Sequence, residues 1–345
     1  MAPSLRTIVR LLRDADTSVL AFHAAYALRQ KVARAALGAR AQTVPTALYV
    51  ETSSFCRGRC RDCYVPVADR RRHLRLEATE LDALVRSVSG LGLDYVCIVG
   101  GEPLDEAIVD LNVRLVREHP RVRFLLCTGA AAGSGDAALD ELASLANVSL
   151  VFSFDGLEPT HDRIRGRDSF RRTCAALRRY GRSGRRLVGA SVMLTSDNWD
   201  ECTRLAFLET LCELGCAYVV LDPCFGAEAT SLTASDYARA SERLVALSSR
   251  TSATLYAYPF GPLAGPTAEL RATMRTLAVD YRGDVYVSRR GRSFGNIREQ
   301  GLELILQSPA LQRALGDAGR SEHAGDPRRD LFDDTLAILR RGEPV

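Results

Sequence analysis

Three cysteines that stand close together form the first pattern in this sequence that could do chemistry. They lie in Cys56-Arg-Gly-Arg-Cys60-Arg-Asp-Cys63-Tyr64, which has the spacing CxxxCxxC. Thiolate is the ligand that iron–sulfur clusters select, and three thiolates on one loop can hold three corners of a cubane [4Fe–4S] cluster. The fourth cysteine is missing locally, so one iron would keep an open coordination position. We therefore expect Cys56, Cys60 and Cys63 to bind one such cluster.

A structural zinc site is the main alternative for the same three cysteines. Structural zinc takes a closed tetrahedron of four ligands, usually from two CxxC-like pairs. Apart from Cys60 and Cys63, the sequence has no CxxC pair, and it has no histidine pair at finger spacing. The ligand count favours the iron–sulfur cluster, and a zinc-binding or non-catalytic scaffold protein stays open as the alternative of another class.

A second pattern, Gly100-Gly101-Glu102-Pro103, follows the strand-like run Tyr95–Val99. Taken alone it is a turn signal. After a strand, two residues that lack Cβ let the backbone approach a ligand closely, while Glu102 adds a carboxylate and Pro103 stiffens the exit. The position of this turn therefore predicts a ligand-binding role.

Together the two patterns resemble the signature of the radical S-adenosylmethionine (radical SAM) superfamily. The resemblance implies that the open iron chelates the amino and carboxylate groups of SAM, and that Gly100 to Pro103 bind its ammonium group. It also implies that SAM is cleaved reductively to methionine and a 5′-deoxyadenosyl radical, with an electron donor such as flavodoxin or ferredoxin. Asp62 stands where the family usually carries an aromatic or bulky residue beside adenine, and Tyr64 is expected to compensate.

A third stretch extends the resemblance. Phe152-Ser153-Phe154-Asp155-Gly156, followed by His161-Asp-Arg-Ile-Arg165, is similar to a segment of the SPASM-type and related peptide- and sugar-modifying branches. The resemblance assigns Ser153, Asp155 and Arg165 to the SAM site. A guanidinium group suits this role because it matches a carboxylate with two parallel hydrogen bonds. Turn chemistry after a strand is the alternative for Ser153 and Asp155.

From Pro45 onward, short apolar runs alternate with helical periodicity, which predicts an α/β fold with repeated βα units and a parallel sheet. About six units are fewer than the eight of a closed TIM barrel, and the resemblance also implies an open, partial (β/α)6 barrel. Asn198 and Glu201 are expected to cap the last barrel helix. The predicted strands are Ala47–Glu51, Tyr95–Val99, Val122–Cys127, Ser149–Phe154, Leu187–Leu194 and Ala217–Leu221, and the predicted helices lie near Glu80–Leu91, Ile108–Glu118, Ala137–Leu145, Phe170–Tyr180 and Trp199–Leu214.

The chain is expected to divide into four parts, 1–44, 45–235, 236–316 and 317–345. Residues 1–44 are expected to form an amphipathic helical segment that packs on the barrel, with membrane-surface or substrate docking as the alternative. Residues 45–235 form the barrel, and residues 317–345 form a charged helix and a polar tail. The third combines helices near Asp236–Ser248 and Leu302–Leu315 with a hairpin pattern around Arg282-Gly283-Asp284, and it resembles the small C-terminal extension called SPASM or twitch.

Cysteines of that extension bind auxiliary iron–sulfur clusters in the family. Here Ser288 replaces the hairpin cysteine and no cysteine follows Cys224. Because a hydroxyl is a poor ligand for a soft metal, we expect a single cluster. Without an auxiliary cluster to carry an electron away, we expect a redox-neutral outcome or hydrogen-atom return: epimerisation, rearrangement, elimination, decarboxylation or C–C coupling.

Three residues at predicted strand ends are candidate catalytic residues. Cys224 and Asp222 follow the sixth strand, and Cys127 ends the third. The thiol of Cys224 or Cys127 could return a hydrogen atom, and Asp222 could bind a substrate hydroxyl or ammonium group. Core packing is the alternative for the cysteines. The missing auxiliary cysteines and the lack of a separate peptide-recognition domain favour a small polar substrate, namely a sugar, aminoglycoside or nucleoside intermediate of a specialised-metabolite pathway; a ribosomal peptide is the alternative.

Composition narrows the remaining classes. The 345 residues are 46% hydrophobic and 26% charged, as is ordinary for a soluble globular protein. A net charge of +4 without a basic block argues against nucleic acid as a partner, and no long apolar run predicts a membrane span. The ten cysteines do not form a secreted disulfide framework. An oxidisable cluster requires a reducing compartment, so we expect a cytoplasmic protein.

Overall fold

The computed structural model describes residues 17–130, 136–182, 187–223, 230–248, 250–251, 253–257, 261–262, 275–287 and 292–318. Ten strands form one sheet in the order β10-β9-β1-β2-β3-β4-β5-β6-β7-β8. The strands are β1 (Ala47–Ser53), β2 (Tyr95–Gly100), β3 (Phe124–Thr128), β4 (Val148–Ser153), β5 (Gly189–Leu194), β6 (Tyr218–Pro223), β7 (Thr254–Ala257), β8 (Gly261–Pro262), β9 (Thr276–Val279) and β10 (Val285–Val287).

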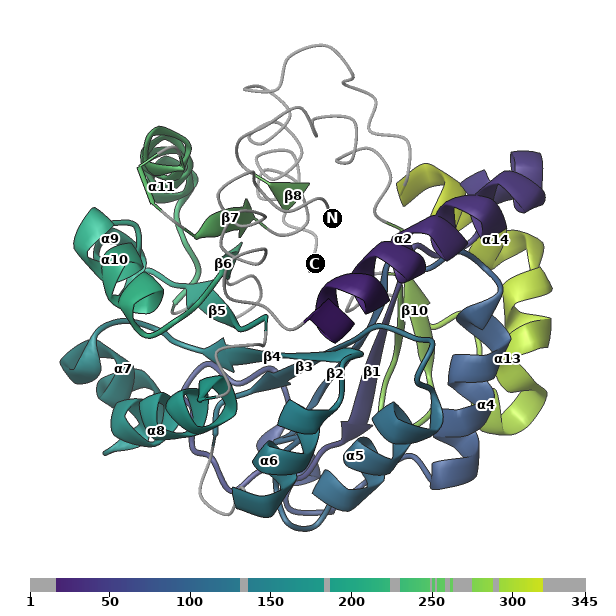
Figure 1. Ribbon diagram of the computed structural model, residues 1–345, viewed down its shortest axis with the longest axis horizontal. Coiled ribbons are helices and arrows are strands. Elements are labelled where there is room, and N and C mark those ends of the chain that lie inside the picture. Colours follow the sequence, from purple (N-terminus) through teal and green to yellow (C-terminus); the bar gives the residue numbers. More distant parts are fainter. Residues whose placement is uncertain are drawn as a thin grey trace.

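Eight neighbouring strands of this sheet, β9 and β1 to β7, are parallel. The two outermost strands pair antiparallel, β10 with β9 and β8 with β7. In the described part of the chain the two outermost strands do not pair with each other, so the sheet is an open, partial barrel (Figure 1). The α/β fold expected from the sequence is confirmed.

Helices cover the convex side of the sheet and one of its ends (Figure 1). They are α2 (Thr17–Leu37), α3 (Val67–Arg70), α4 (Ala78–Ser89), α5 (Val109–Glu118), α6 (Asp136–Ser144), α7 (Glu158–Arg165), α8 (Ser169–Gly181), α9 (Trp199–Cys202), α10 (Leu205–Glu213), α11 (Ala234–Leu247), α13 (Ile297–Gln307) and α14 (Pro309–Ala318), and a short 3-10 helix covers Gly38–Gln42. Within the described ranges, none of these helices combines the length and the apolarity needed to cross a membrane.

Alternate residues of each strand face two different environments, as the pleat of a strand requires. The main core joins one set to the helices, for example Leu48, Ile98 and Leu126. The other set packs only against other strands, as Tyr49 and Cys97 do, and forms the concave inner face of the barrel. Side chains of this inner face reach the carboxyl ends of the parallel strands, where ligands of such folds collect.

The sheet contains two parallel strands beyond the six that the sequence predicts for the barrel. All six predicted strands are present, and β7 continues the sheet beyond β6 while β9 joins it beside β1. The expected hairpin is present as β9 and β10, but β9 pairs in register with β1, Ala47 opposite Thr276. Periodicity shows that a segment is a strand and gives no information about a partner more than 200 residues away in the sequence.

Two predicted helices are each interrupted. The stretch Trp199–Leu214 forms α9 and α10, because Nη1 of Arg243 donates to the carbonyl oxygen of Asp200 at 3.0 Å, and Arg204 is extended there with ψ 148°. The stretch Leu302–Leu315 is divided at Pro309, which has no backbone N–H, between α13 and α14. Helix α7 was not among the predicted helices.

Asn198 is the N-cap residue of α9, as expected, but the expected side-chain capping bonds are not formed. Oδ1 of Asn198 accepts from the backbone of Thr195 at 2.7 Å, and Oε1 of Glu201 accepts from the backbone of Leu157 at 2.9 Å. Both side chains therefore hold loops at the strand ends and do not bond to the first turn of their own helix. A capping box occurs instead at α4, where Oε2 of Glu80 accepts from the backbone of Glu77 at 2.7 Å.

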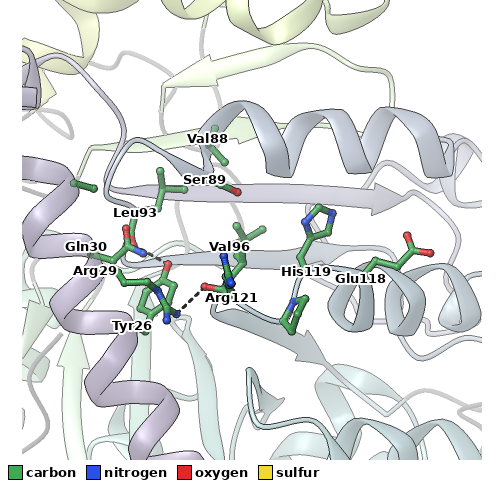
Figure 2. A pocket seen from close by; sticks show the side chains of 13 residues that line it. Tyr26, Arg29, Gln30, Val88, Ser89, Leu93, Val96, Glu118, His119 and Arg121 are labelled. Carbon is green, nitrogen blue, oxygen red and sulfur yellow. Dashed lines mark hydrogen bonds between the residues drawn. The ribbon is translucent and has the colours of Figure 1, made fainter. Parts of the chain in front are cut away.

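Helix α2 lies across the amino-terminal ends of β2 and β3. The Tyr26 hydroxyl donates to the carbonyl oxygen of Leu93 at 2.8 Å, and Nη2 of Arg29 donates to that of Arg121 at 3.2 Å (Figure 2). These polar contacts leave a cavity of about 540 Å³ between the helix and the barrel. The cavity lies at the end of the barrel opposite the cysteine loop, so it is separate from the site described next.

Candidate functional site

The three cysteines of the CxxxCxxC pattern lie on the loop that follows β1, at the carboxyl end of the sheet. All three are half-buried. The backbone N–H of Gly58 donates to Sγ of Cys56 at 3.2 Å, so a backbone dipole points at the sulfur of a candidate ligand. Hydrogen bonds of this kind tune iron–sulfur clusters.

The three thiols lie close enough to affect one another. Burial raises the pKa of Cys56 to about 12, and the charges of Glu102, Cys60 and Cys63 add to that effect. Burial also raises the pKa of Cys60, against the opposing charge of Arg165. These two thiols are therefore protonated at neutral pH without metal and must lose their protons when they bind iron.

The donor set fits a cubane cluster. In such a cluster each thiolate binds a different iron, so the sulfurs need to surround a volume and need not meet at one point. Across the described segments, no three His, Cys, Asp or Glu side chains converge on the position of a single metal ion. The three thiols of one half-buried loop would hold a [4Fe–4S] cluster at three of its corners.

The two glycines of the Gly100–Pro103 turn are required by contact with the cysteine loop. A Cβ on Gly101 would lie 1.9 Å from the carbonyl oxygen of Phe55, and a Cβ on Gly100 would lie 2.5 Å from that of Ser53. Gly100 also has φ +115°, which favours glycine. The close approach expected from the sequence is thus made to the protein's own backbone, directly before Cys56.

This contact is closed by backbone hydrogen bonds. The N–H of Gly101 donates to Ser53 at 2.6 Å, and the N–H of Glu102 donates to Phe55 at 2.8 Å. The Tyr64 hydroxyl donates to the carbonyl oxygen of Gly100 at 3.2 Å and accepts from its N–H at 3.0 Å. The loop and the turn therefore form one rigid unit, and the role of Tyr64 beside adenine stays a prediction.

Glu102 is almost fully buried and ties two strand ends together. Its Oε1 accepts from the hydroxyl of Thr128 at 2.5 Å and from the backbone of Leu104 at 3.1 Å, and its Oε2 accepts from the backbone of Gly129 at 3.1 Å. The carbonyl oxygen of Pro103 accepts from the side chain of Asn112 at 2.9 Å. Glu102 and Pro103 thus fix the turn to the end of β3 and to α5.

Arg165 and Asp155 form a buried ion pair beside the cysteines. Nε of Arg165 donates to Oδ2 of Asp155 at 2.5 Å, and the side chains are 15% and 2% exposed. Although burial alone would lower the pKa of Arg165, the charges of Asp155 and Cys60 raise it. A Cβ at Gly129 would lie 3.1 Å from Nη1 of Arg165 and 3.6 Å from Oε2 of Glu102, so both charged groups border the same space.

His161 is a residue of this site that we did not select from the sequence, although it stands in the same motif as Arg165. It is fully buried, and the backbone N–H of Asp155 donates to its Nδ1 at 3.1 Å. Burial, with the charge of Arg165, lowers its pKa to about 4. His161 is therefore neutral at physiological pH and holds the backbone of Asp155.

The remaining candidates lie on the inner face or outside the described residues. Ser153 and Asp222 stand at the ends of β4 and β6. Cys127 is on the inner face of β3, and its Sγ lies 3.7 Å from that of Cys97. Cys224, and Ser288 of the predicted auxiliary position, lie outside the described residues.

The fold and the cysteine loop together define an iron–sulfur enzyme with an open, partial (β/α) barrel. Residues 50–208 match the family model of the Radical SAM superfamily. The matched segment is a radical SAM domain, so the chain contains the catalytic domain of a radical SAM enzyme, which uses a [4Fe–4S] cluster and SAM as cofactors. Comparison with curated protein sequences gives no match.

Several solved structures share the fold. Streptococcus suis SuiB bound to S-adenosylmethionine is 16% identical with a TM-score of 0.62, over 79% of this chain and 68% of that one. SuiB bound to the precursor peptide SuiA is also 16% identical, with a TM-score of 0.63 over 79% and 67%. Native anSMEcpe with bound AdoMet is 16% identical, with a TM-score of 0.62 over 84% and 88%.

Proposed function

We propose that this enzyme abstracts a hydrogen atom from a small polar molecule that carries an amine, such as a sugar, aminoglycoside or nucleoside intermediate of specialised-metabolite biosynthesis. The pattern of side chains on the inner face of the barrel is the observation that carries this proposal. Away from the carboxyl ends of the strands, this inner face is filled by apolar and aromatic side chains, among them Tyr95, Val151 and Tyr218. A substrate is therefore confined to the carboxyl ends of the strands.

Three carboxylates stand at the carboxyl ends of strands on this inner face, two on the neighbouring strands β1 and β9 and one on β6. By alternation along each strand, Glu51 shares a face with Tyr49, Asp222 with Val220, and Asp280 follows Ala278. Burial and the neighbouring Asp284 raise the pKa of Asp280. Carboxylates in a partly enclosed site attract an ammonium group, because the low local dielectric strengthens the interaction.

When bound, the cluster and SAM supply the 5′-deoxyadenosyl radical that abstracts hydrogen. The chain's own residues have three tasks. Cys56, Cys60 and Cys63 would hold the iron, and Gly100–Pro103, Ser153, Asp155 and Arg165 would hold SAM. The Arg165 guanidinium complements the SAM carboxylate. The carboxylates at the strand ends orient the substrate, and the barrel excludes water from it.

We propose a single cluster and a redox-neutral or hydrogen-returning outcome. The hairpin β9–β10 is then a SPASM- or twitch-like remnant without metal ligands. Cys224 and Cys127 are the candidate hydrogen donors; Cys127 is supported by its place on the inner face, next to Thr128, which holds Glu102. A flavodoxin or ferredoxin in the cytoplasm would supply the electron.

A ribosomal peptide is the second candidate substrate. It is favoured by the fold shared with SuiB, which has been solved with the precursor peptide SuiA, and with anSMEcpe, which has been solved with the peptide Cp18Cys. The carboxylates around the mouth favour the amine-bearing small molecule instead.

Anaerobic reconstitution tests the enzymatic part of the proposal. We expect a brown protein with about four irons per chain, which releases 5′-deoxyadenosine when SAM and a reductant are added. The Cys60→Ala variant should not release it. A colourless protein that holds one zinc would show that the zinc-binding alternative is correct, and more than about four irons would contradict the single cluster.

The substrate class is tested by measuring the release of 5′-deoxyadenosine in the presence of candidate substrates. An aminoglycoside such as neamine should increase 5′-deoxyadenosine formation by wild-type enzyme, and Asp222→Asn should weaken that response roughly tenfold because a charge-assisted contact is lost. Asp110→Asn, on the outer helix α5, is the matched control. Stimulation by peptides and not by amine-bearing sugars would favour the second candidate.

A further inference from the structure

The loop that carries the cysteines extends across the mouth of the open barrel. It begins after β1, yet the backbone N–H of Arg61 donates to the carbonyl oxygen of Ile164, in the helix that follows β4, at 3.0 Å. Nη1 of Arg61 lies 2.7 Å from Oδ2 of Asp197, which follows β5. The hydroxyl of Thr230, which follows β6, donates to Oδ1 of Asp62 at 2.9 Å. The loop is thus bonded to segments after three strands on the opposite side of the sheet.

The side chain of Asp62 is enclosed by this set of contacts. Its side chain is 4% exposed, and Thr230 is 7% exposed. Nη2 of Arg61 also donates to Oδ2 of Asp62 at 3.0 Å. A carboxylate enclosed to this degree requires such donors, because an unpaired buried charge is strongly unfavourable.

We propose that Asp62 and Thr230 are positioning residues that hold the cysteine loop in the geometry that the cluster and SAM require. Asp62 directly precedes Cys63 and stands two residues after Cys60, so a fixed Asp62 fixes the separation of two iron ligands. The position at which the resemblance led us to expect an adenine contact is instead used to close the mouth of the barrel. The bond joins the loop after β1 to the segment after β6, across a sheet whose two outermost strands do not pair in the described part of the chain.

This inference rests on the cluster site and not on the choice of substrate. The hydroxyl of Thr230 is the part of the contact that can be removed without changing a residue of the cysteine loop. Valine has the same shape as threonine and cannot donate, so Thr230→Val leaves Asp62 buried with one donor fewer. The cost of an unmade bond to a buried charged group corresponds to roughly a tenfold change in an equilibrium.

The test measures the reconstituted enzyme in the absence of substrate. We expect Thr230→Val to lose its iron to a chelator about five- to tenfold faster than wild type. We also expect the change that SAM causes in the electron paramagnetic resonance spectrum of the reduced cluster to be altered. Thr230→Ser keeps the donor and should behave as wild type. Thr210→Val removes an exposed hydroxyl on α10 that bonds only within its helix, and it should have no effect.

Two results would overturn the proposal. One is equal iron loss and an unchanged SAM response in Thr230→Val and wild type. The other is equal impairment of Thr230→Val and Thr230→Ser, which would assign the effect to packing and not to the hydrogen bond. A wild-type chain that binds no iron would instead contradict the proposed function, so the two failures can be told apart.

Discussion

His161 and Arg165 lie one turn apart on α7, and both bond to Asp155. His161 accepts from the backbone of Asp155, and Arg165 donates to its carboxylate. Oδ1 of Asp155 also accepts from the backbone of Met193 at 3.2 Å, so the residue is held from β5 as well. Asp155 is thereby fixed from three directions, and it in turn orients the guanidinium of Arg165, for which we propose a contact with SAM.

The buried, neutral state of His161 predicts a pH dependence of stability. Its pKa is about 4 in the folded protein, below its ordinary value of 6.5. Between these pH values the unfolded chain binds more protons, so the free energy of unfolding decreases as the pH falls from 6.5 to 4, by about 3 kcal/mol in all. This contribution is fully present above pH 6.5.

The His161→Asn variant tests that dependence, because its amide oxygen can accept from Asp155 and does not titrate. Urea unfolding of metal-free protein at pH 7 and pH 5 should show a smaller difference in the variant than in wild type. An identical difference in the two proteins would mean that His161 does not titrate on unfolding in this range.

At the scale of elements, the turn after β2 and the loop after β1 act as a single unit. The unit depends on the two glycines, whose missing side chains leave room for the carbonyl oxygens of Ser53 and Phe55. Its outer side is held by Arg57, whose Nε lies 3.4 Å from Oδ2 of the buried Asp105. The conformation of the cysteine loop is therefore fixed by packing between neighbouring strand ends.

A methyl group at Gly101 should separate these two elements. In Gly101→Ala the new Cβ would lie 1.9 Å from a backbone oxygen, which cannot move without shifting Cys56. We expect a loss of at least about 2 kcal/mol in the free energy of unfolding, together with incomplete iron loading. Denaturant unfolding and iron analysis measure the two effects.

Gly90→Ala is the matched control, because a Cβ added to Gly90 would have nothing within 4 Å and this residue ends α4 with φ −86°. It should be neutral or slightly stabilising. Normal stability and full iron loading in Gly101→Ala would show that the turn is not packed on the loop in this way.

At the scale of the whole molecule, one hydrophobic core extends past residue 235, where the sequence suggests a boundary. Leu277 and Val279 of β9, Val285 of β10 and Ile305 of α13 belong to the same core as Leu48 of β1. Both oxygens of Asp69, just beyond the cysteine loop, accept from Nη2 of Arg282 at 2.6 Å, in the β9–β10 turn.

A chain shortened after residue 235 should therefore fail to fold. It would expose the edge of β1 and the apolar residues that β9 and α13 cover, and an uncovered parallel edge strand favours aggregation. A chain shortened after residue 318 keeps every described element and is the control. A soluble, cooperatively unfolding 1–235 chain would support the predicted boundary and contradict this expectation.

Much of the fold could be predicted because its signals are local. The six barrel strands, the helices between them and the hairpin all have a periodicity that is visible within ten or so residues. The break between α9 and α10 could not be predicted from that periodicity, since it depends on Arg243 from a distant helix. The break between α13 and α14 has a local signal, Pro309, that periodicity alone does not use. The pairing of β9 with β1 was likewise invisible, because strand periodicity does not name a partner.

The sequence by itself predicted the chemistry of this protein, since three cysteines within eight consecutive residues, at the spacing CxxxCxxC, favour an iron–sulfur cluster over zinc. Only the tertiary structure decided how that loop is held. It brought Thr230 to Asp62, placed His161 within hydrogen-bonding distance of the backbone of Asp155 and packed Gly101 against Phe55. Hydrogen bonds and close packing act over a few ångströms, so they depend on which distant segments the fold brings together.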